Sequence, residues 1–300
     1  MSVLLVGSIG IDDIITPYAS AEKVLGGSGS YASFAISLFT QAKLIGVVGT
    51  DFKEKYLPLF KKENIDIKGL KIKEGKTFYW KGEYKENFNE RVTHITELNV
   101  FADFDPEVPD EYKNEKYIFL ANIDPDLQIK VLKNLNNPRF VLLDTMKLWI
   151  DTKFDELIKA FKMVNAVIIN DEEARLIFKT KNLYKAAREL VKLGPEWAII
   201  KKGEHGVILY SKKGELFLLP AYPVEDVIDP TGAGDSFAGA MIGYIAKENE
   251  INFSILKKSI VWGTVVASFT IQDFSVNKLI KITKEDLEKR YNNFLEYIKI

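Results

Sequence analysis

Short apolar runs alternate with segments of helical periodicity along most of the chain. Residues 3–9 form an apolar run that predicts a buried strand, and residues 28–39 repeat their apolar positions at helical spacing. Strands that alternate with helices are typical of a doubly wound, mostly parallel sheet with helices on both faces. We therefore predict an α/β fold of three layers, α/β/α, in a single domain over residues 1–300. Further strands are expected at 43–48, 116–121, 139–144, 166–170, 197–201 and 207–210, and further helices at 53–63, 125–135, 154–163, 171–178 and 182–193, with three helices from about residue 234 onward.

One stretch interrupts this alternation. Residues 77–84 and 91–100 have the pattern of paired strands around a polar turn at 85–90, where a helix would be expected. A hairpin that leaves an α/β core must cover something, because its own apolar face is otherwise wasted. We predict a small β-sheet inserted at about 74–101, together with part of 11–20. The alternative is an edge hairpin without a function.

Composition narrows the possible functions. The chain has 300 residues, a hydrophobic fraction of 47% and a net charge of −1, which favours a globular protein and gives no reason to expect nucleic-acid or membrane-surface binding. It has no cysteine and two histidines, which excludes disulfides, thiolate catalysis and sites built from several histidines. No basic leader precedes the first strand, and the uncharged stretch 259–272 is shorter than the roughly 20 residues that cross a bilayer. A cytoplasmic protein is expected.

The most informative segment is 229–240, which reads Asp-Pro-Thr-Gly-Ala-Gly-Asp-Ser-Phe-Ala-Gly-Ala. Its glycines permit a tight turn whose N–H groups point at one spot, and a helix that begins there adds unpaired N–H groups and the positive end of its dipole. The segment therefore predicts an anion cradle suited to phosphate. Asp235 lies beside it, where a base can take a proton from a hydroxyl. The alternative is a capping loop in which Asp235 only favours the first turn.

This segment resembles the C-terminal signature of the ribokinase-like (phosphofructokinase-B type) carbohydrate kinase family, Asp-x-x-Gly-Ala-Gly-Asp. The resemblance implies a ribokinase-like core in which the small β-sheet is a lid over the acceptor and a possible homodimer interface. It also implies ATP and Mg²⁺ as cofactors, with a monovalent cation as a further possibility. Of the matching residues, Asp235 takes the role of catalytic base, Gly232, Ala233 and Gly234 provide the anion hole, and Thr231 is expected at the nucleotide.

Two further segments match the family's acceptor site. Asp12 follows the first strand, where open α/β sheets bind ligands, and a carboxylate there can accept hydrogen bonds from sugar hydroxyls. Asp13 is the alternative, since a slip of one residue is easy in a loop. Gly26 and Gly27 resemble the N-terminal Gly-Gly signature and let the backbone approach the substrate closely. Tyr31 stands where many members carry a sugar-binding Asn, which leaves the identity of the acceptor open.

The nucleotide side is expected at three places. Asn170 and Glu173 match the family's Asn-x-x-Glu element, which implies that they hold Mg²⁺ through its water molecules and do not bind the metal directly. The alternative is helix capping, which explains the same local pattern. The turn after the strand 197–201 resembles the family's nucleotide loop, and there Lys202, Gly203 and Gly206 are expected near ATP. The adenine pocket is expected within 259–277, which holds Ala267 and Ser268.

The segment that begins at Asp144 departs from the family pattern. Members often show Asp-Pro-Asn followed by Arg there, whereas this chain keeps the Asp and has Thr145 and Met146, with Lys147 near the Arg place. The departure lies close to the expected path of the phosphoryl group.

Together these residues predict ATP-dependent transfer of a phosphoryl group to a primary hydroxyl of a small sugar. An alternative acceptor is a nucleoside such as adenosine, because the aromatic residues Phe78, Tyr79 and Trp80 in the expected lid can stack on a base. A second alternative is a ligand-binding member of the fold without turnover. No nucleic-acid or membrane partner is expected.

Overall fold

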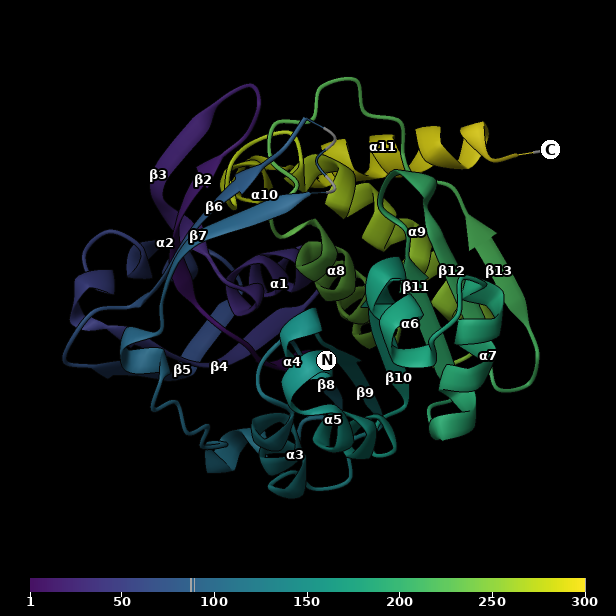
Figure 1. Cartoon of the computed structure of the whole chain (residues 1–300), viewed down its shortest axis with the longest axis horizontal. Helices are drawn as coiled ribbons and strands as arrows, with labels where there is room; N and C mark the ends of the chain where they lie inside the picture. The colour runs from purple at the N-terminus through teal and green to yellow at the C-terminus, as the bar shows by residue number, and fades with distance from the viewer. Residues whose placement is uncertain (87, 89, 300) are drawn as a thin grey trace.

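The computed structural model describes residues 1–86, 88 and 90–299. It contains one large sheet, one small sheet, and helices on both faces of the large sheet (Figure 1). The large sheet has nine strands in the order β13-β12-β11-β10-β9-β8-β1-β4-β5. These strands are β1 (Ser2–Val6), β4 (Gln41–Gly49), β5 (Ile65–Lys73), β8 (Tyr117–Leu120), β9 (Phe140–Asp144), β10 (Ala166–Asn170), β11 (Trp197–Lys201), β12 (Val207–Ser211) and β13 (Leu216–Leu219).

The large sheet is parallel from β5 to β11, and β12 and β13 are added antiparallel at one edge. The chain builds outward from β1 in both directions, toward β4 and β5 on one side and toward β8 on the other. In such sheets a crevice opens at the carboxyl ends of the strands where the direction of winding changes. The turns that follow β1, β9, β10 and β11 therefore converge on one region.

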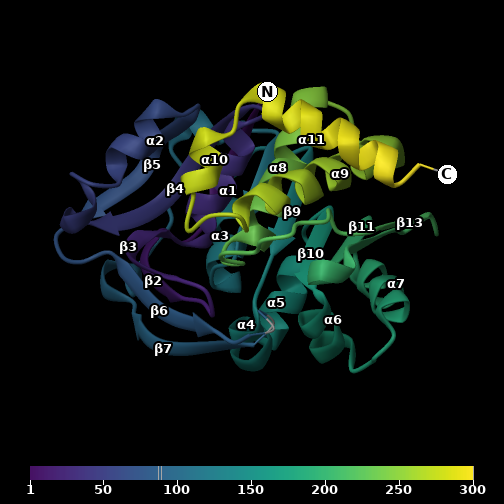
Figure 2. The ribbon, with the colours of Figure 1, turned by 90° about the horizontal axis from the view of Figure 1, so that it is seen from above.

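Two layers of helices cover the large sheet (Figure 2). Alternate residues of β1 belong to different cores: Val3 and Leu5 pack with α1, α8 and α9, whereas Leu4 and Val6 pack with α3, α5, α6 and α7. This division follows from the period of two along a strand that is buried on both faces. The helices are α1 (Ser28–Ser37), α2 (Leu57–Lys62), α3 (Pro125–Lys133), α4 (Lys147–Thr152), α5 (Phe154–Phe161), α6 (Asp171–Phe178), α7 (Leu183–Leu193), α8 (Ala233–Glu248), α9 (Phe253–Thr270), α10 (Asn277–Lys281) and α11 (Lys284–Tyr297).

Helices α1 and α8 lie unusually close together because small residues line their contact. A Cβ on Gly239 would lie 2.6 Å from the carbonyl oxygen of Ala32, and one on Gly243 would lie 3.2 Å from the Cα of Ile36. The close approach also brings the first turns of the two helices side by side. The two glycine-rich segments of the sequence, one before each helix, therefore meet at the same end of the molecule.

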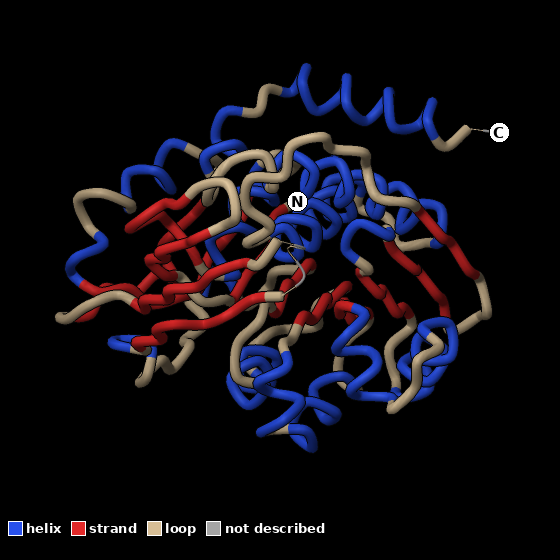
Figure 3. Tube along the Cα trace, turned by 45° about the horizontal axis from the view of Figure 1, so that its top comes forward, coloured by secondary structure: helices blue, strands red, loops and turns tan. Residues whose placement is uncertain are grey.

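The small sheet has four strands in the order β3-β2-β6-β7, and it stands apart from the large sheet (Figure 3). Its strands are β2 (Gly10–Ile15), β3 (Ser20–Gly26), β6 (Phe78–Tyr84) and β7 (Arg91–Glu97). The hairpin predicted around 85–90 is therefore confirmed, and it pairs with β2 through a parallel β2–β6 ladder. Residues 87 and 89 of its turn lie outside the described residues.

Three expectations about element bounds are wrong. The strand expected at 3–9 ends at Val6, because a Cβ on Gly7 would lie 2.7 Å from the backbone nitrogen of Gly29 and the chain then turns toward the small sheet. The helix expected at 53–63 begins only at Leu57, with Pro58 in its first turn, where proline is favoured. In the described part of the tail there are four helices, since Ser275 adopts a positive φ of 59° after α9 and Thr283 caps a new helix, α11.

Within the described residues, no helix combines the length and the apolar character needed to cross a membrane.

Candidate active site

The two glycine-rich turns meet at the N-termini of α1 and α8. Gly27 precedes α1 with a φ of 90°, and a Cβ there would lie 2.5 Å from the carbonyl oxygen of Ser8. Gly232 precedes α8 with a φ of 75°, and a Cβ there would lie 2.2 Å from the ring of Tyr31. Tyr31, which stands where many family members carry a sugar-binding Asn, thus packs against the backbone of the second glycine turn. Both turns require glycine for its conformation and for the space that it leaves.

Asp12 joins these turns from β2. A Cβ on Gly26 would lie 1.9 Å from Oδ2 of Asp12, so the first glycine of the pair makes room for this carboxylate. Asp12 is 3% exposed, and burial, followed by the negative charge of Asp229, raises its pKa to about 8. Asp13 points to the other face of the small sheet, where its carboxylate accepts hydrogen bonds from the Tyr79 hydroxyl and a backbone N–H. Of the two predicted alternatives, the structure therefore places Asp12 beside the glycine turns.

The raised pKa of Asp12 predicts a pH-dependent stability. The folded protein keeps a proton that the unfolded chain releases above about pH 4, so this contribution to stability is present at low pH and is lost as the pH rises toward 8. The side chain of the Asp12→Asn variant is neutral at every pH and has no such dependence. We therefore expect the free energy of unfolding of this variant to rise relative to wild type between pH 5 and 8.5, by on the order of 2–5 kcal/mol.

Urea unfolding of both proteins across this pH range measures the difference. Asp13→Asn is the matched control, because Asp13 is the next residue along the strand and its carboxylate faces the opposite side of the sheet. If Asp12→Asn and wild type ran parallel with pH, Asp12 would not be the buried acid of the site.

Asp235 lies in the first turn of α8 and belongs to a cluster of charges that also contains the buried Asp144 and the half-buried Lys201. The amine of Lys201, at the end of β11, donates a hydrogen bond of 2.9 Å to Oδ2 of Asp144, at the end of β9. The same amine would lie 3.0 Å from a Cβ on Gly234. Burial and the charge of Asp144 raise the pKa of Asp235 to about 6, with Lys201 and Arg91 counteracting the rise. Burial also raises the pKa of Asp229, at the start of the glycine turn, to about 6, but the Asp229 carboxylate already accepts a hydrogen bond from the N–H of Thr231.

The amides of this turn are only partly free in the structure. The N–H of Ala233 donates to the carbonyl of Pro230 at 3.2 Å, and that of Thr231 donates to Oδ1 of Asp229 at 2.9 Å. The first turn of any helix leaves N–H groups without a partner inside the helix, and in α8 these belong to the residues around Gly234. The turn therefore keeps N–H groups that an anion can use.

Asn170 and Glu173 form a capping box at the start of α6. The Asn170 side chain accepts from the N–H of Glu173, and the Glu173 carboxylate accepts from the N–H of Asn170, both at 2.8 Å. Burial and the charge of Asp144 raise the pKa of Glu173 to about 8, and Lys201 counteracts them. The capping alternative is thus present in the structure, and the box leaves the second carboxylate oxygen of Glu173 and the side-chain NH₂ of Asn170 unused.

A cavity of about 570 Å³ opens beside the N-terminus of α8. Gly203, Gly206, Ala233 and Gly234, which were all among the predicted site residues, line it. Lys202 does not line it, whereas its neighbour Lys201 does. The other lining residues come from the loop after β13, from α8 and α9, and from the tip of the small sheet: Phe88, Glu204, Val207, Ala221, Tyr222, Pro223, Val224, Val227, Pro230, Phe237, Thr264, Ala267, Ser268 and Ile271.

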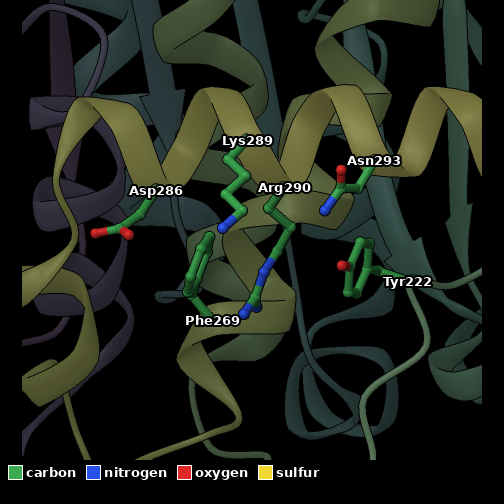
Figure 4. A pocket seen from close by; sticks show the side chains of 6 residues that line it. All are labelled: Tyr222, Phe269, Asp286, Lys289, Arg290 and Asn293. Carbon is green, nitrogen blue, oxygen red and sulfur yellow. The ribbon is translucent and has the colours of Figure 1, made fainter.

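A smaller cavity lies behind this one, between α9 and α11 (Figure 4). Arg290 points into it from α11, with its guanidinium 3.4 Å from the ring centroid of Phe269, and donates a hydrogen bond to Ser268. Tyr222 lines both cavities. Arg290 therefore supports the wall of the larger cavity from outside, through Ser268 and Tyr222.

The small sheet contacts the glycine turn directly. The hydroxyl of Thr231 donates a hydrogen bond of 3.1 Å to Oη of Tyr84, at the end of β6. Tyr84 is 8% exposed. The sequence analysis did not single out Tyr84, Lys201 or the loop 221–227. Lys201 could have been found from the sequence, because it ends the predicted strand that leads into the expected nucleotide loop.

Comparison with solved structures identifies the fold. The fold matches the nucleoside kinase of Methanocaldococcus jannaschii, an archaeal member of the ribokinase family, with a TM-score of 0.78 and 20% identity over 97% of this chain and 98% of that one. The predicted fold class, a ribokinase-like α/β core with a smaller sheet, is thereby confirmed.

Sequence comparison gives the family. The model of the pfkB family carbohydrate kinases matches residues 3–282, and the chain belongs to this family. It is 30% identical over 252 residues to the cytidine kinase of Thermococcus kodakarensis, covering 81% of this chain and 88% of that protein. It is also 25% identical over 273 residues to a nucleoside kinase of Methanocaldococcus jannaschii, covering 84% of this chain and 81% of that protein. The protein is a kinase of sugars or nucleosides.

Proposed function

We propose that this protein transfers the γ-phosphoryl group of ATP to the primary hydroxyl of a nucleoside, with Asp235 as the general base. The observation that carries the proposal is the position of Asp235 at the end of the glycine turn 229–235, in the first turn of α8. Its charge interacts with Asp144 and Lys201 at the ends of β9 and β11, and with Asp12 and Arg91 of the small sheet.

The chemistry assigned to Asp235 follows from its pKa of about 6. At neutral pH this carboxylate is ionised and accepts the hydroxyl proton as the oxygen attacks phosphorus. A base with a pKa just below the working pH combines a high ionised fraction with useful proton affinity. We assign the stabilisation of negative charge on the transferred group to the N–H groups of Gly232 and Gly234 and to the amine of Lys201, which lies beside Gly234.

The acceptor is held on the side of Asp12 and Tyr31. The Tyr31 hydroxyl is buried and has no hydrogen-bond partner among the described residues, so it is available to an acceptor hydroxyl. A nucleoside is favoured over a free sugar for two reasons. Trp80 pairs with Asp12 in the β2–β6 ladder and so lies on the same face of the small sheet, where a ring can stack on a base. The curated relatives named above are kinases of cytidine and of nucleosides.

The donor side is the 570 Å³ cavity, which has the size and the largely apolar lining of a site for a purine ring. The described residues contain no cluster of three or more Asp, Glu or His side chains arranged for a metal. They fit Mg²⁺ held mainly by water and phosphate, because Glu173 keeps one carboxylate oxygen beyond the capping box and Oδ1 of Asn170 has a second lone pair for a water molecule. When bound there, Mg²⁺ would neutralise charge on the phosphates. Lys202 and Thr231 stay candidate nucleotide contacts, and dimerisation through the small sheet stays a prediction.

A panel of acceptors tests the proposal. ATP and Mg²⁺ are incubated with the protein and cytidine, adenosine, inosine, ribose or fructose, and the phosphorylated acceptor is measured by mass spectrometry. We expect kcat/KM for the preferred nucleoside to exceed that for ribose by at least about 10²-fold, since a base adds binding contacts that ribose lacks. Activity should disappear in excess EDTA and return with Mg²⁺. A preference for a free sugar would overturn the nucleoside proposal and leave the kinase class intact.

A further inference from the structure

Three side chains of the small sheet gather on the face that covers the glycine turn. Tyr84 accepts the hydrogen bond from Thr231, and Arg91 lies directly opposite Tyr84 in the β6–β7 ladder. The guanidinium of Arg91 is hydrogen-bonded to Tyr84 and lies 5.4 Å from the ring centroid of Trp80. Trp80 and Tyr84 are four residues apart on one strand, so they share a face, and Trp80 pairs with Asp12 on that face.

Charge places Arg91 between the two sides of the site. Its guanidinium counteracts the rise in pKa of Asp12, on the acceptor side, and of Asp235, in the first turn of α8. Lys201 approaches the glycine turn from the large sheet, with its amine close to Gly234. The turn therefore has the amine of Lys201 beside Gly234, and Arg91 lies opposite Tyr84, which is hydrogen-bonded to Thr231 of the same turn.

The chemistry of an arginine suits this position. A planar guanidinium presents several N–H donors that match the oxygens of a phosphoryl group in pairs, and it stacks on an aromatic ring such as that of Trp80. Strand β7 is exposed along its length, so Arg91 remains accessible to an incoming phosphate. The charge of Arg91 acts on Asp12, which is buried, and on Asp235, which is half-buried, and this gives the guanidinium a place in the site beyond packing on Trp80.

We propose that Arg91 is a further catalytic residue, which the small sheet supplies to the phosphoryl group during transfer. The inference rests on the proposed function. As the acceptor oxygen forms its bond to phosphorus, the bond from phosphorus to the leaving oxygen of the nucleoside diphosphate breaks, and the hydroxyl proton passes to Asp235. Arg91 keeps its proton throughout and donates hydrogen bonds to the oxygens on which charge develops. Closure of the small sheet over the acceptor would thereby complete the phosphate site.

Arg91→Ala and Arg91→Lys test this role, with Lys81→Ala as the matched control. Lys81 is also a cation of the small sheet, but it alternates with Trp80 and so faces the other side. We expect Arg91→Ala to lower kcat by about 10²–10³-fold, with both KM values changed by less than about threefold. Arg91→Lys should fall between, because it restores the charge without the paired donors, and added guanidinium ion should recover part of the activity of Arg91→Ala. Lys81→Ala should match wild type.

Binding of a transition-state mimic gives a readout that does not depend on turnover. We expect Arg91→Ala to weaken binding of ADP with aluminium fluoride and the acceptor by at least about 10²-fold in calorimetry, and to leave binding of ADP alone unchanged. The inference is overturned if the variant binds the mimic as wild type does, or if only the acceptor KM rises, which would make Arg91 an acceptor contact. A wild-type protein that phosphorylates no acceptor would instead refute the proposed function.

Discussion

Asp235→Asn is expected to lower kcat for phosphoryl transfer by about 10²–10⁴-fold, because an amide cannot accept the hydroxyl proton. The substitution keeps the size of the side chain and removes a carboxylate that burial makes costly, so the fold should be retained. Binding of ATP, measured by calorimetry, should be within a few-fold of wild type. The variant therefore separates binding from chemistry.

The pH dependence of the wild-type enzyme provides a second view of the same residue. The base must be ionised, so kcat should rise with pH through a limb near 6 and then level off. Asp144→Asn is a useful comparison, because removal of its negative charge should shift this limb to lower pH. Asp235 would not be the base if Asp235→Asn kept more than about a tenth of the wild-type turnover at saturating substrates.

Gly232→Ala is expected to lower kcat by at least about 10²-fold, by deforming the turn whose N–H groups receive the phosphoryl group. Gly232 has a φ of 75°, which alanine adopts only with strain, and a Cβ there would lie 2.2 Å from the Tyr31 ring. Both the backbone and Tyr31 must shift to admit one methyl group. The effect therefore reaches the acceptor side as well, and the acceptor KM should rise together with the fall in kcat.

Gly234→Ala is the matched control for this prediction. Its backbone is helical, and the atom nearest to a new Cβ is Nζ of Lys201, at 3.0 Å, which is the mobile end of a flexible side chain. We expect this variant to lose clearly less activity than Gly232→Ala. A Gly232→Ala enzyme with wild-type kcat would contradict the role of the turn, and equal losses in both variants would mean that the loss comes from general disturbance of α8.

The parts of the site that were predictable from sequence are those encoded locally. The two glycine turns each stand at the start of a helix, where backbone chemistry alone indicates an anion or a ligand, whereas Asp12, expected in a loop after the first strand, lies inside β2. The structure adds why they meet, since small residues let α1 and α8 approach and place the Tyr31 ring against Gly232.

The parts that escaped prediction depend on contacts between distant segments. The positions of Tyr84 and Arg91 over the glycine turn depend on the β2–β6 pairing, in which Asp12 lies opposite Trp80. No local pattern reports that register. The loop 221–227 has no periodicity of its own, and it becomes part of the cavity only because α8 and α9 lie beside it. Likewise, β13 and α4 are too short for a clear pattern.

The most direct measurement is phosphorus NMR of the product formed from ATP, Mg²⁺ and cytidine by the wild-type protein. Transfer to a primary hydroxyl predicts a new phosphomonoester signal that is split into a triplet by the two protons of the adjacent CH₂ group, and Asp235→Asn should not produce it. If ADP accumulated without any phosphorylated acceptor, or if the new signal were a doublet from a secondary alcohol, the proposed transfer to a primary hydroxyl would be contradicted.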